Sequence, residues 1–232
     1  MEERIYIAFY KPDGVMTAFT DPQGRETLKT YIDVPGVYSA GRLDLDSEGL
    51  LLLTNDGRLA HRLTDPGFQH PKTYLVQVEG VPSPEALAAL ESGVEVKGRL
   101  TRRCQAMVVP APVLPSRRKP VTPHGPTTWL RIVLREGKKR QIRHMTAAVG
   151  LPTLRLVRIA LGPIGLGELQ PGGWRHLSPA EVETLRQMTA SPVGRRLAAE
   201  RQKIKVGEKP AASQGSARGS RYRSGDRRPP GR

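Results

Sequence analysis

The chain has 232 residues, and its 37 lysines and arginines outnumber 22 aspartates and glutamates, which gives a net charge of +15. This length allows one large domain or two small ones, and no apolar run reaches the ~18–20 residues that a membrane-spanning helix needs. Cys104 is the only cysteine, which excludes an intramolecular disulfide and argues against a cysteine-based zinc site. We therefore expect a cytoplasmic protein that binds a polyanion, with nucleic acid first and a membrane surface second.

The charge is concentrated toward the C-terminus. Residues 191–232 contain 12 basic and 3 acidic side chains, a net charge of +9 that leaves +6 on residues 1–190. The end of this tail is mostly glycine, serine, alanine, proline and arginine, which bury too little apolar area to offset chain entropy, so we expect it to be disordered. The tail either binds RNA backbone without reading sequence or only keeps the protein soluble.

Residues 1–190 form the predicted folded domain, and its elements follow no regular βαβ rhythm, which favours an α+β fold. Apolar periodicity, helix caps and turn residues predict the following elements in chain order: strand 4–10, turn 11–14, strand 50–53, helix 57–63 capped by Asp56, strand 72–79, helix 83–93, loop 110–126, strand 129–136, helix 138–149, and a helix that begins with the capping box of Ser178 and Glu181. A loop as long as 110–126 is expected to be either functional or disordered.

An acidic segment, residues 41–49, stands directly before the strand predicted at 50–53. Its carboxylates, Asp44, Asp46 and Glu48, need cationic or hydrogen-bonding partners if they are held against apolar surface. A solvated acidic turn is the simplest interpretation. A calcium loop is rejected because Asn55 occupies the twelfth position, where a bidentate glutamate is required. A paired-carboxylate hydrolase is disfavoured because no aromatic platform for a sugar is present.

A basic segment, residues 136–145, follows the last predicted strand. Lys139, Arg140 and Arg143 are expected to share one face of the predicted helix, where they could bind phosphates or a buried carboxylate. The alternative is an ordinary solvated basic face, on which Gln141 would be a surface polar residue. The five histidines show no pair at metal-ligand spacing, so no metal site is expected.

Taken together and in order, these segments resemble the signatures of the RsuA-type ribosomal RNA pseudouridine synthases, and the likeness extends from about residue 6 to residue 185. The matching stretches are 41–44 with 46–57, 72–74, 136–143 and 154–175. The joint occurrence is highly specific, whereas any single stretch would only be suggestive. The departures are His144, where relatives often have arginine, and the basic tail.

The resemblance implies the pseudouridine synthase fold, with a mostly antiparallel mixed sheet, flanking helices and two subdomains around a central catalytic cleft. The chain opens directly on residues of the catalytic domain, so we expect no S4 RNA-binding domain. The start directly on the catalytic domain and the Pro/Arg-rich loop over 110–126 favour the branch of the family that acts on large-subunit (23S) rRNA. We further expect a monomer.

The resemblance also implies an isomerase that converts one uridine to pseudouridine without metal or cofactor. Asp44 would be the catalytic carboxylate, which either attacks the sugar covalently or abstracts a sugar proton. Arg143 would keep Asp44 ionised and oriented.

Four further residues would bind the substrate. Tyr74 would stack on the uracil and take part in proton transfer at C5, and Arg42 would help to displace the target base from its stack. Arg140 and Arg158 would contact phosphates. The competing hypotheses are a non-catalytic RNA-binding or ribosome-assembly protein, and the same chemistry on another structured RNA.

Overall fold

The structure is a computed structural model that describes residues 3–190; the predicted tail, 191–232, lies outside the described residues. Strands and helices are mixed, so the α+β prediction is confirmed. The elements, in chain order, are β1 (Tyr6–Lys11), the 3₁₀ helix η1 (Leu28–Thr30), β2 (Tyr38–Ser39), β3 (Glu48–Thr54), α1 (Gly57–Thr64), β4 (Lys72–Glu79), α2 (Pro84–Ser92), β5 (Glu95–Val96), β6 (Arg99–Leu100), β7 (Gln105–Val109), β8 (Thr127–Leu134), α3 (Gln141–Ala148), β9 (Thr153–Leu161), β10 (Ile164–Gly165), β11 (Trp174–His176) and α4 (Pro179–Ala190).

One mixed sheet runs through the described part of the chain, in the order β11-β1-β3-β9-β4-β8-β7, with β10 paired to β9 and β2 paired to β3. Its pairs are antiparallel except β3 with β9, which is parallel. Strand β9, absent from the predicted elements, lies at the centre between β3 and β4, although it comes late in the chain. The expected mostly antiparallel mixed sheet is confirmed.

Local sequence signals account for several of the helix starts. The side chain of Asp56 accepts hydrogen bonds from the backbone N–H groups of Arg58 and Leu59, which would otherwise lack partners at the start of α1. Ser178 and Glu181 form the predicted reciprocal capping box before α4, with each side chain accepting from the backbone N–H of the other residue. These caps fix where α1 and α4 begin and so direct both helices onto the sheet.

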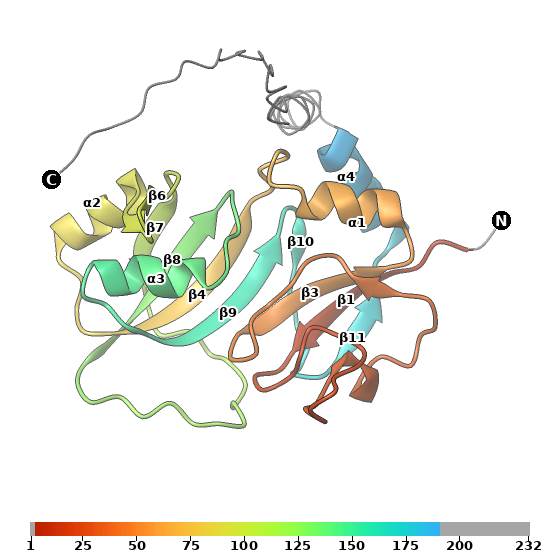
Figure 1. Cartoon of the computed structure of the whole chain (residues 1–232), viewed down its shortest axis with the longest axis horizontal. Coiled ribbons are helices and arrows are strands. Elements are labelled where there is room, and N and C mark those ends of the chain that lie inside the picture. Colours follow the sequence, from red (N-terminus) through yellow and green to blue (C-terminus); the bar gives the residue numbers. More distant parts are fainter. Residues whose placement is uncertain (1–2, 191–232) are drawn as a thin grey trace, which may run out of the picture.

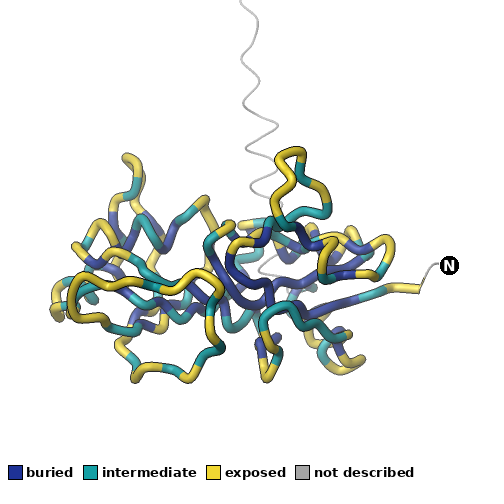
Figure 2. The backbone as a smooth tube through the Cα atoms, turned by 90° about the horizontal axis from the view of Figure 1, so that it is seen from below, coloured by how far each residue is buried: buried dark blue, intermediate teal, exposed yellow. Residues whose placement is uncertain are grey.

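Each half of the sheet has its own apolar core. Helices α1 and α4 cover the half that holds β1 and β3, whereas α2 and α3 cover the half that holds β4 and β8 (Figure 1). A third cluster fills the opposite face of β1 and β3 and includes Leu28 of η1. Figure 2 shows buried backbone through the interior of both halves, with exposed segments mainly in peripheral loops. Strand β9 joins the two halves and contributes to both cores.

The segment before α3 differs from its prediction. Helix α3 begins at Gln141 rather than near residue 138, because Arg140 adopts a left-handed backbone conformation with φ of 54°. Lys139 and Arg140 therefore lie in a turn, and only Arg143 of the three basic residues belongs to the helix. Gln141 is also buried rather than a surface residue. Residues 110–126 form no helix or strand, as predicted.

Candidate active site

A cavity of about 460 Å³ opens at the junction of the two halves of the sheet. Its walls come from the 40–47 loop, the end of α1, the first residues of β4, the turn between β8 and α3, and β9. Five of the six predicted site residues line it, namely Arg42, Asp44, Tyr74, Arg140 and Arg158. The structure therefore brings together residues that are more than a hundred positions apart in the chain.

The backbone around Asp44 is fixed by the loop that follows β1. The N–H of Ser47 donates to the carbonyl of Asp44 (3.1 Å) and closes a tight turn over residues 44–47, here called the Asp44 turn. The carbonyl of Leu45 accepts from the N–H of Gly14 (2.8 Å), and the hydroxyl of Thr17 exchanges hydrogen bonds with the backbone of Leu43. The turn is thus held rigidly, which is the arrangement that a positioned reactive group needs.

Arginines bind Asp46, the second carboxylate of the acidic segment. Arg140 donates Nη1 and Nη2 to the two carboxylate oxygens of Asp46 at 3.0 and 3.1 Å, and Arg143 Nη2 lies 3.2 Å from Oδ2. Arg143 also donates from Nη2 to the backbone carbonyl of Asp46 at 3.0 Å. Arg143 thus forms its ion pair with Asp46, and its expected role of keeping Asp44 ionised and oriented stays a prediction.

Glu48, the third carboxylate, is buried beneath the turn. Arg155 donates Nε and Nη2 to its two oxygens at 3.0 and 2.8 Å, a fork geometry that matches a carboxylate well. Asp44 differs from both neighbours, because its side chain makes no hydrogen bond or ion pair with any residue in 3–190. Since Asp46 and Glu48 are committed to arginines, Asp44 is the one carboxylate of the three that is free to meet a ligand in the cavity.

Positive charge gathers beside the Asp44 turn. Burial disfavours the charged form of Asp46, but the hydrogen bonds from Arg140 and the charges of Arg143 and Arg140 outweigh it, so the pKa of Asp46 lies below its ordinary value. Two arginines thus share one ionised carboxylate and leave a surplus positive charge. The charge of Asp44 acts on both arginines, although its side chain contacts neither of them.

Tyr74 and Arg158 face each other across β4 and β9, where they are paired in register. Tyr74 is nearly buried, and Arg158 is only 3% exposed, with Nε donating to the carbonyl of Leu50 at 2.7 Å. The Nη2 of Arg158 is buried and has no hydrogen-bond partner in the described residues. Arg158 therefore lines the cavity with very little of its surface exposed, and its expected phosphate contact stays a prediction.

Lys72, also in the cavity wall, was not singled out from the sequence, although it stands two residues before Tyr74. Its Nζ donates to the carbonyl of His70 at 3.3 Å. Burial, together with the charge of Arg158, lowers the pKa of Lys72 to about 8. A half-buried lysine beside a buried arginine makes this part of the cavity wall cationic, and no periodicity in the sequence could have revealed it.

Lys72 makes stability depend on pH in a predictable direction. Below pH 8 the lysine is charged in the folded and unfolded states, and the full cost of burying that charge is present. Between pH 8 and the ordinary lysine value of 10.5, the folded state loses its proton first, so stability rises with pH. We expect Lys72→Met to be more stable than the wild type at pH 7 by on the order of 1–3 kcal/mol, and this difference to shrink by pH 10.

Urea denaturation at pH 7 and pH 10 measures that difference directly. Lys29→Met, which removes an exposed lysine of η1, is the matched control and should shift stability equally at both pH values. A Lys72→Met difference that is the same at pH 7 and pH 10 would contradict the prediction.

Within residues 3–190 no helix is long and apolar enough to cross a bilayer, and no three or more histidine, cysteine, aspartate or glutamate side chains gather as a metal site would require. The arginines on Asp46 and Glu48 likewise leave no cage for calcium. What remains is a basic cavity with one unpaired carboxylate and one tyrosine, built on a mixed sheet. This combination defines an enzyme that acts on part of a polyanion rather than a simple polyanion binder.

The chain belongs to the RNA pseudouridylate synthase family, whose model matches residues 5–148. Members of this family are isomerases. It is 50% identical over 179 residues to the ribosomal large subunit pseudouridine synthase E of Vibrio parahaemolyticus, covering 76% of this chain and 75% of that protein. A relative of the same name from Xanthomonas axonopodis is 54% identical over 166 residues, covering 69% of this chain and 87% of the relative.

The fold agrees with this assignment. A crystal structure of a pseudouridylate synthase superimposes with a TM-score of 0.68 at 30% sequence identity, covering 80% of this chain and 75% of that one. The resemblance found in the sequence is thereby confirmed at the level of the family and its fold.

Proposed function

We propose that this protein converts a uridine of large-subunit ribosomal RNA to pseudouridine, with Asp44 as the catalytic carboxylate and without a cofactor. The observation that carries the proposal is the unpaired side chain of Asp44 in the wall of a cationic cavity, beside two carboxylates that are both paired with arginine. The substrate class is supported by the names of relatives that are 50% and 54% identical.

The reaction breaks the bond between N1 of the uracil and C1′ of the ribose, turns the base, and joins C5 to C1′ with loss of the proton on C5. Whether the carboxylate attacks C1′ or removes a sugar proton, it must be ionised and free of a permanent partner. Asp44 meets the second requirement, and Arg140 and Arg143 place positive charge close to it. Their attachment to Asp46 keeps them near Asp44 without blocking it.

The remaining residues divide the work of holding the base. A base can react here only after it leaves the RNA stack, and Arg42, exposed at the edge of the cavity, is placed to fill the gap that it leaves. Tyr74 provides a ring against which the uracil stacks and a hydroxyl for proton transfer at C5. Arg158, which also lines the cavity, would contact the substrate there.

The experiment that tests the proposal uses rRNA transcripts labelled with tritium at C5 of uridine, because isomerisation releases that tritium to water. The full-length protein should release tritium from large-subunit rRNA, and primer extension after chemical modification should place the new pseudouridine at one position. Small-subunit rRNA is the control RNA and should release none. Tight RNA binding without tritium release would instead support a non-catalytic RNA-binding protein, and release from another RNA only would overturn the proposed substrate.

A further inference from the structure

The loop over residues 110–126, here called the strap, leaves the half of the sheet that holds β7 and β8 and reaches the other half. Backbone N–H groups of Arg118 and Lys119 donate to the carboxylate of Asp13, at 3.2 and 3.4 Å. The side chain of Arg118 is bound by Glu26 and the hydroxyl of Tyr31. The strap therefore crosses between the two halves of the molecule and is fastened at its far side.

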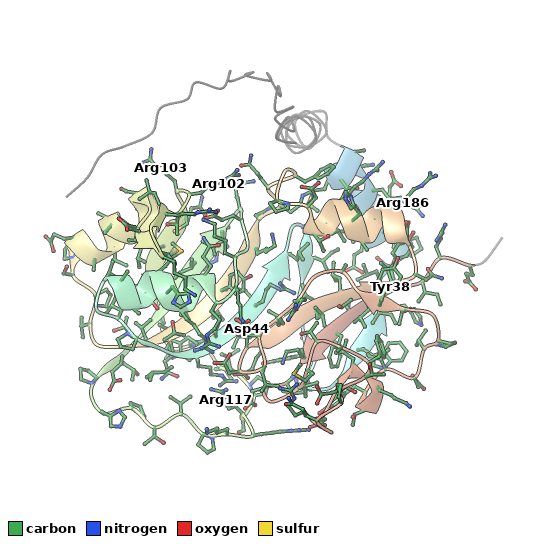
Figure 3. The ribbon with its side chains drawn as sticks, viewed as in Figure 1. Tyr38, Asp44, Arg102, Arg103, Arg117 and Arg186 are labelled. Carbon is green, nitrogen blue, oxygen red and sulfur yellow. The ribbon has the colours of Figure 1, made fainter. Side chains whose placement is uncertain are left out.

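The neighbouring residue of the strap, Arg117, points inward instead. Figure 3 places it directly below Asp44. Its Nε lies between two buried carboxylates, 3.3 Å from Asp13 and 3.4 Å from Glu48. Its Nη2 donates to the backbone carbonyl of Asp46 at 3.5 Å, and its side chain is only 10% exposed. Arg117 thus reaches the Asp44 turn from a segment about 70 residues away.

Two arginines from distant segments contact the Asp44 turn. The backbone carbonyl of Asp46 accepts from Arg143 of α3 at 3.0 Å and from Arg117 of the strap at 3.5 Å. Arg117 also opposes the negative charge of Glu48, the first residue of β3 and the point where the turn ends. Among residues 3–190, removing Arg117 would leave Asp13 with no ion pair and Glu48 with one fewer cation, and buried carboxylates that lose cationic partners draw in water or shift.

We infer that Arg117 is a positioning residue for the Asp44 turn, so that the strap sets the rate of the chemical step rather than the affinity for RNA. The inference rests on the proposed function, in which Asp44 performs the chemistry. A displacement of about 1 Å in a reacting group can lower a rate by about two orders of magnitude. Burial of the Arg117 guanidinium argues against its being an RNA contact, whereas the side chain of Arg118 is 56% exposed.

The test compares Arg117→Gln with Lys119→Gln, which removes an exposed cation of the same strap whose side chain makes no hydrogen bond or ion pair in residues 3–190. Single-turnover tritium release at saturating rRNA reports the chemical step, and filter binding reports the dissociation constant. We expect Arg117→Gln to lower the saturating rate about 10- to 100-fold with the dissociation constant within about threefold of wild type. Lys119→Gln should leave the saturating rate within about twofold.

Arg117→Lys is the second variant and keeps the experiment decisive if the glutamine variant folds poorly. Lysine preserves the charge between Asp13 and Glu48 but loses the fork that reaches the carbonyl of Asp46, so the rate should recover only in part. The inference is overturned if Arg117→Gln retains the full rate, if it weakens RNA binding alone, or if Lys119→Gln lowers the rate equally. An active Asp44→Asn protein would instead overturn the proposed function itself, which separates the two failures.

Discussion

Replacing Asp44 by asparagine is expected to lower the single-turnover rate at saturating rRNA by at least about 10⁴-fold, because an amide can neither attack C1′ nor accept a sugar proton as a carboxylate does. The fold should be unaffected. The side chain of Asp44 makes no hydrogen bond or ion pair within residues 3–190, so its replacement removes no structural contact. Tritium release measures the rate, and thermal unfolding measures the stability.

Asp46→Asn is the matched control, since it makes the same change two residues later. Here the ion pairs with Arg140 and Arg143 are lost, so we expect a lower unfolding temperature together with a smaller rate loss of about 10- to 100-fold. Asp44→Asn should therefore lose the rate and keep its stability, whereas Asp46→Asn should lose stability and show the smaller loss of rate. An Asp44→Asn protein with the same tritium-release rate as the wild type would exclude Asp44 as the catalytic group.

The second large effect concerns Gly49, which is paired with Arg158 where β3 runs beside β9. A Cβ at this position would stand 2.3 Å from the carbonyl oxygen of Arg158 and 2.8 Å from its backbone nitrogen, and the φ of 100° is unfavourable for any residue with a side chain. The obstructing atoms are backbone, so the strands themselves must separate. We expect Gly49→Ala to reduce the free energy of unfolding by at least about 3 kcal/mol and to lower activity.

Gly125→Ala provides the control for this change. Gly125 lies in the strap, and a Cβ there meets no atom within 4 Å. Gly125→Ala should alter the free energy of unfolding, measured by urea denaturation, by less than about 0.5 kcal/mol. A Gly49→Ala protein as stable as Gly125→Ala would show that β3 and β9 tolerate a wider spacing than the structure has.

The sequence predicted the elements whose signals are local. Strand 72–79, the helix after Asp56 and the capping box of Ser178 and Glu181 all appear as expected, because alternation and caps act over a few residues. Strand β9 was not predicted as a strand. Only its pairing with β3 and β4 makes it the central strand of the sheet, and neither neighbour lies close to it in sequence.

In the candidate site, too, the sequence predicted what local motifs encode and missed what depends on the folded chain. Arg42, Asp44, Tyr74, Arg140 and Arg158 were identified from their motifs, and the fold gathers them around one cavity. The ion-pair partners of these residues could not be deduced from the sequence. Nothing local distinguishes Asp44 from Asp46 as the carboxylate that binds arginine, because the choice depends on the left-handed turn at residue 140 and on where α3 meets the Asp44 turn. The inward direction of Arg117 beside the outward Arg118 is likewise decided only by the folded chain.

The central place of β9 has a consequence for protein synthesis. Strands β1, β3, β4 and β8 all leave the ribosome before residues 153–161, yet β3 and β4 have no direct pairing and are joined only through β9. The sheet therefore remains in two pieces during translation until β9 emerges, and the cavity cannot close before then. A nascent chain that has not reached residue 161 holds Asp44 but lacks the wall that Arg158 provides. A chain that stops before β9 therefore lacks one wall of the cavity and the strand that joins the two halves of the sheet.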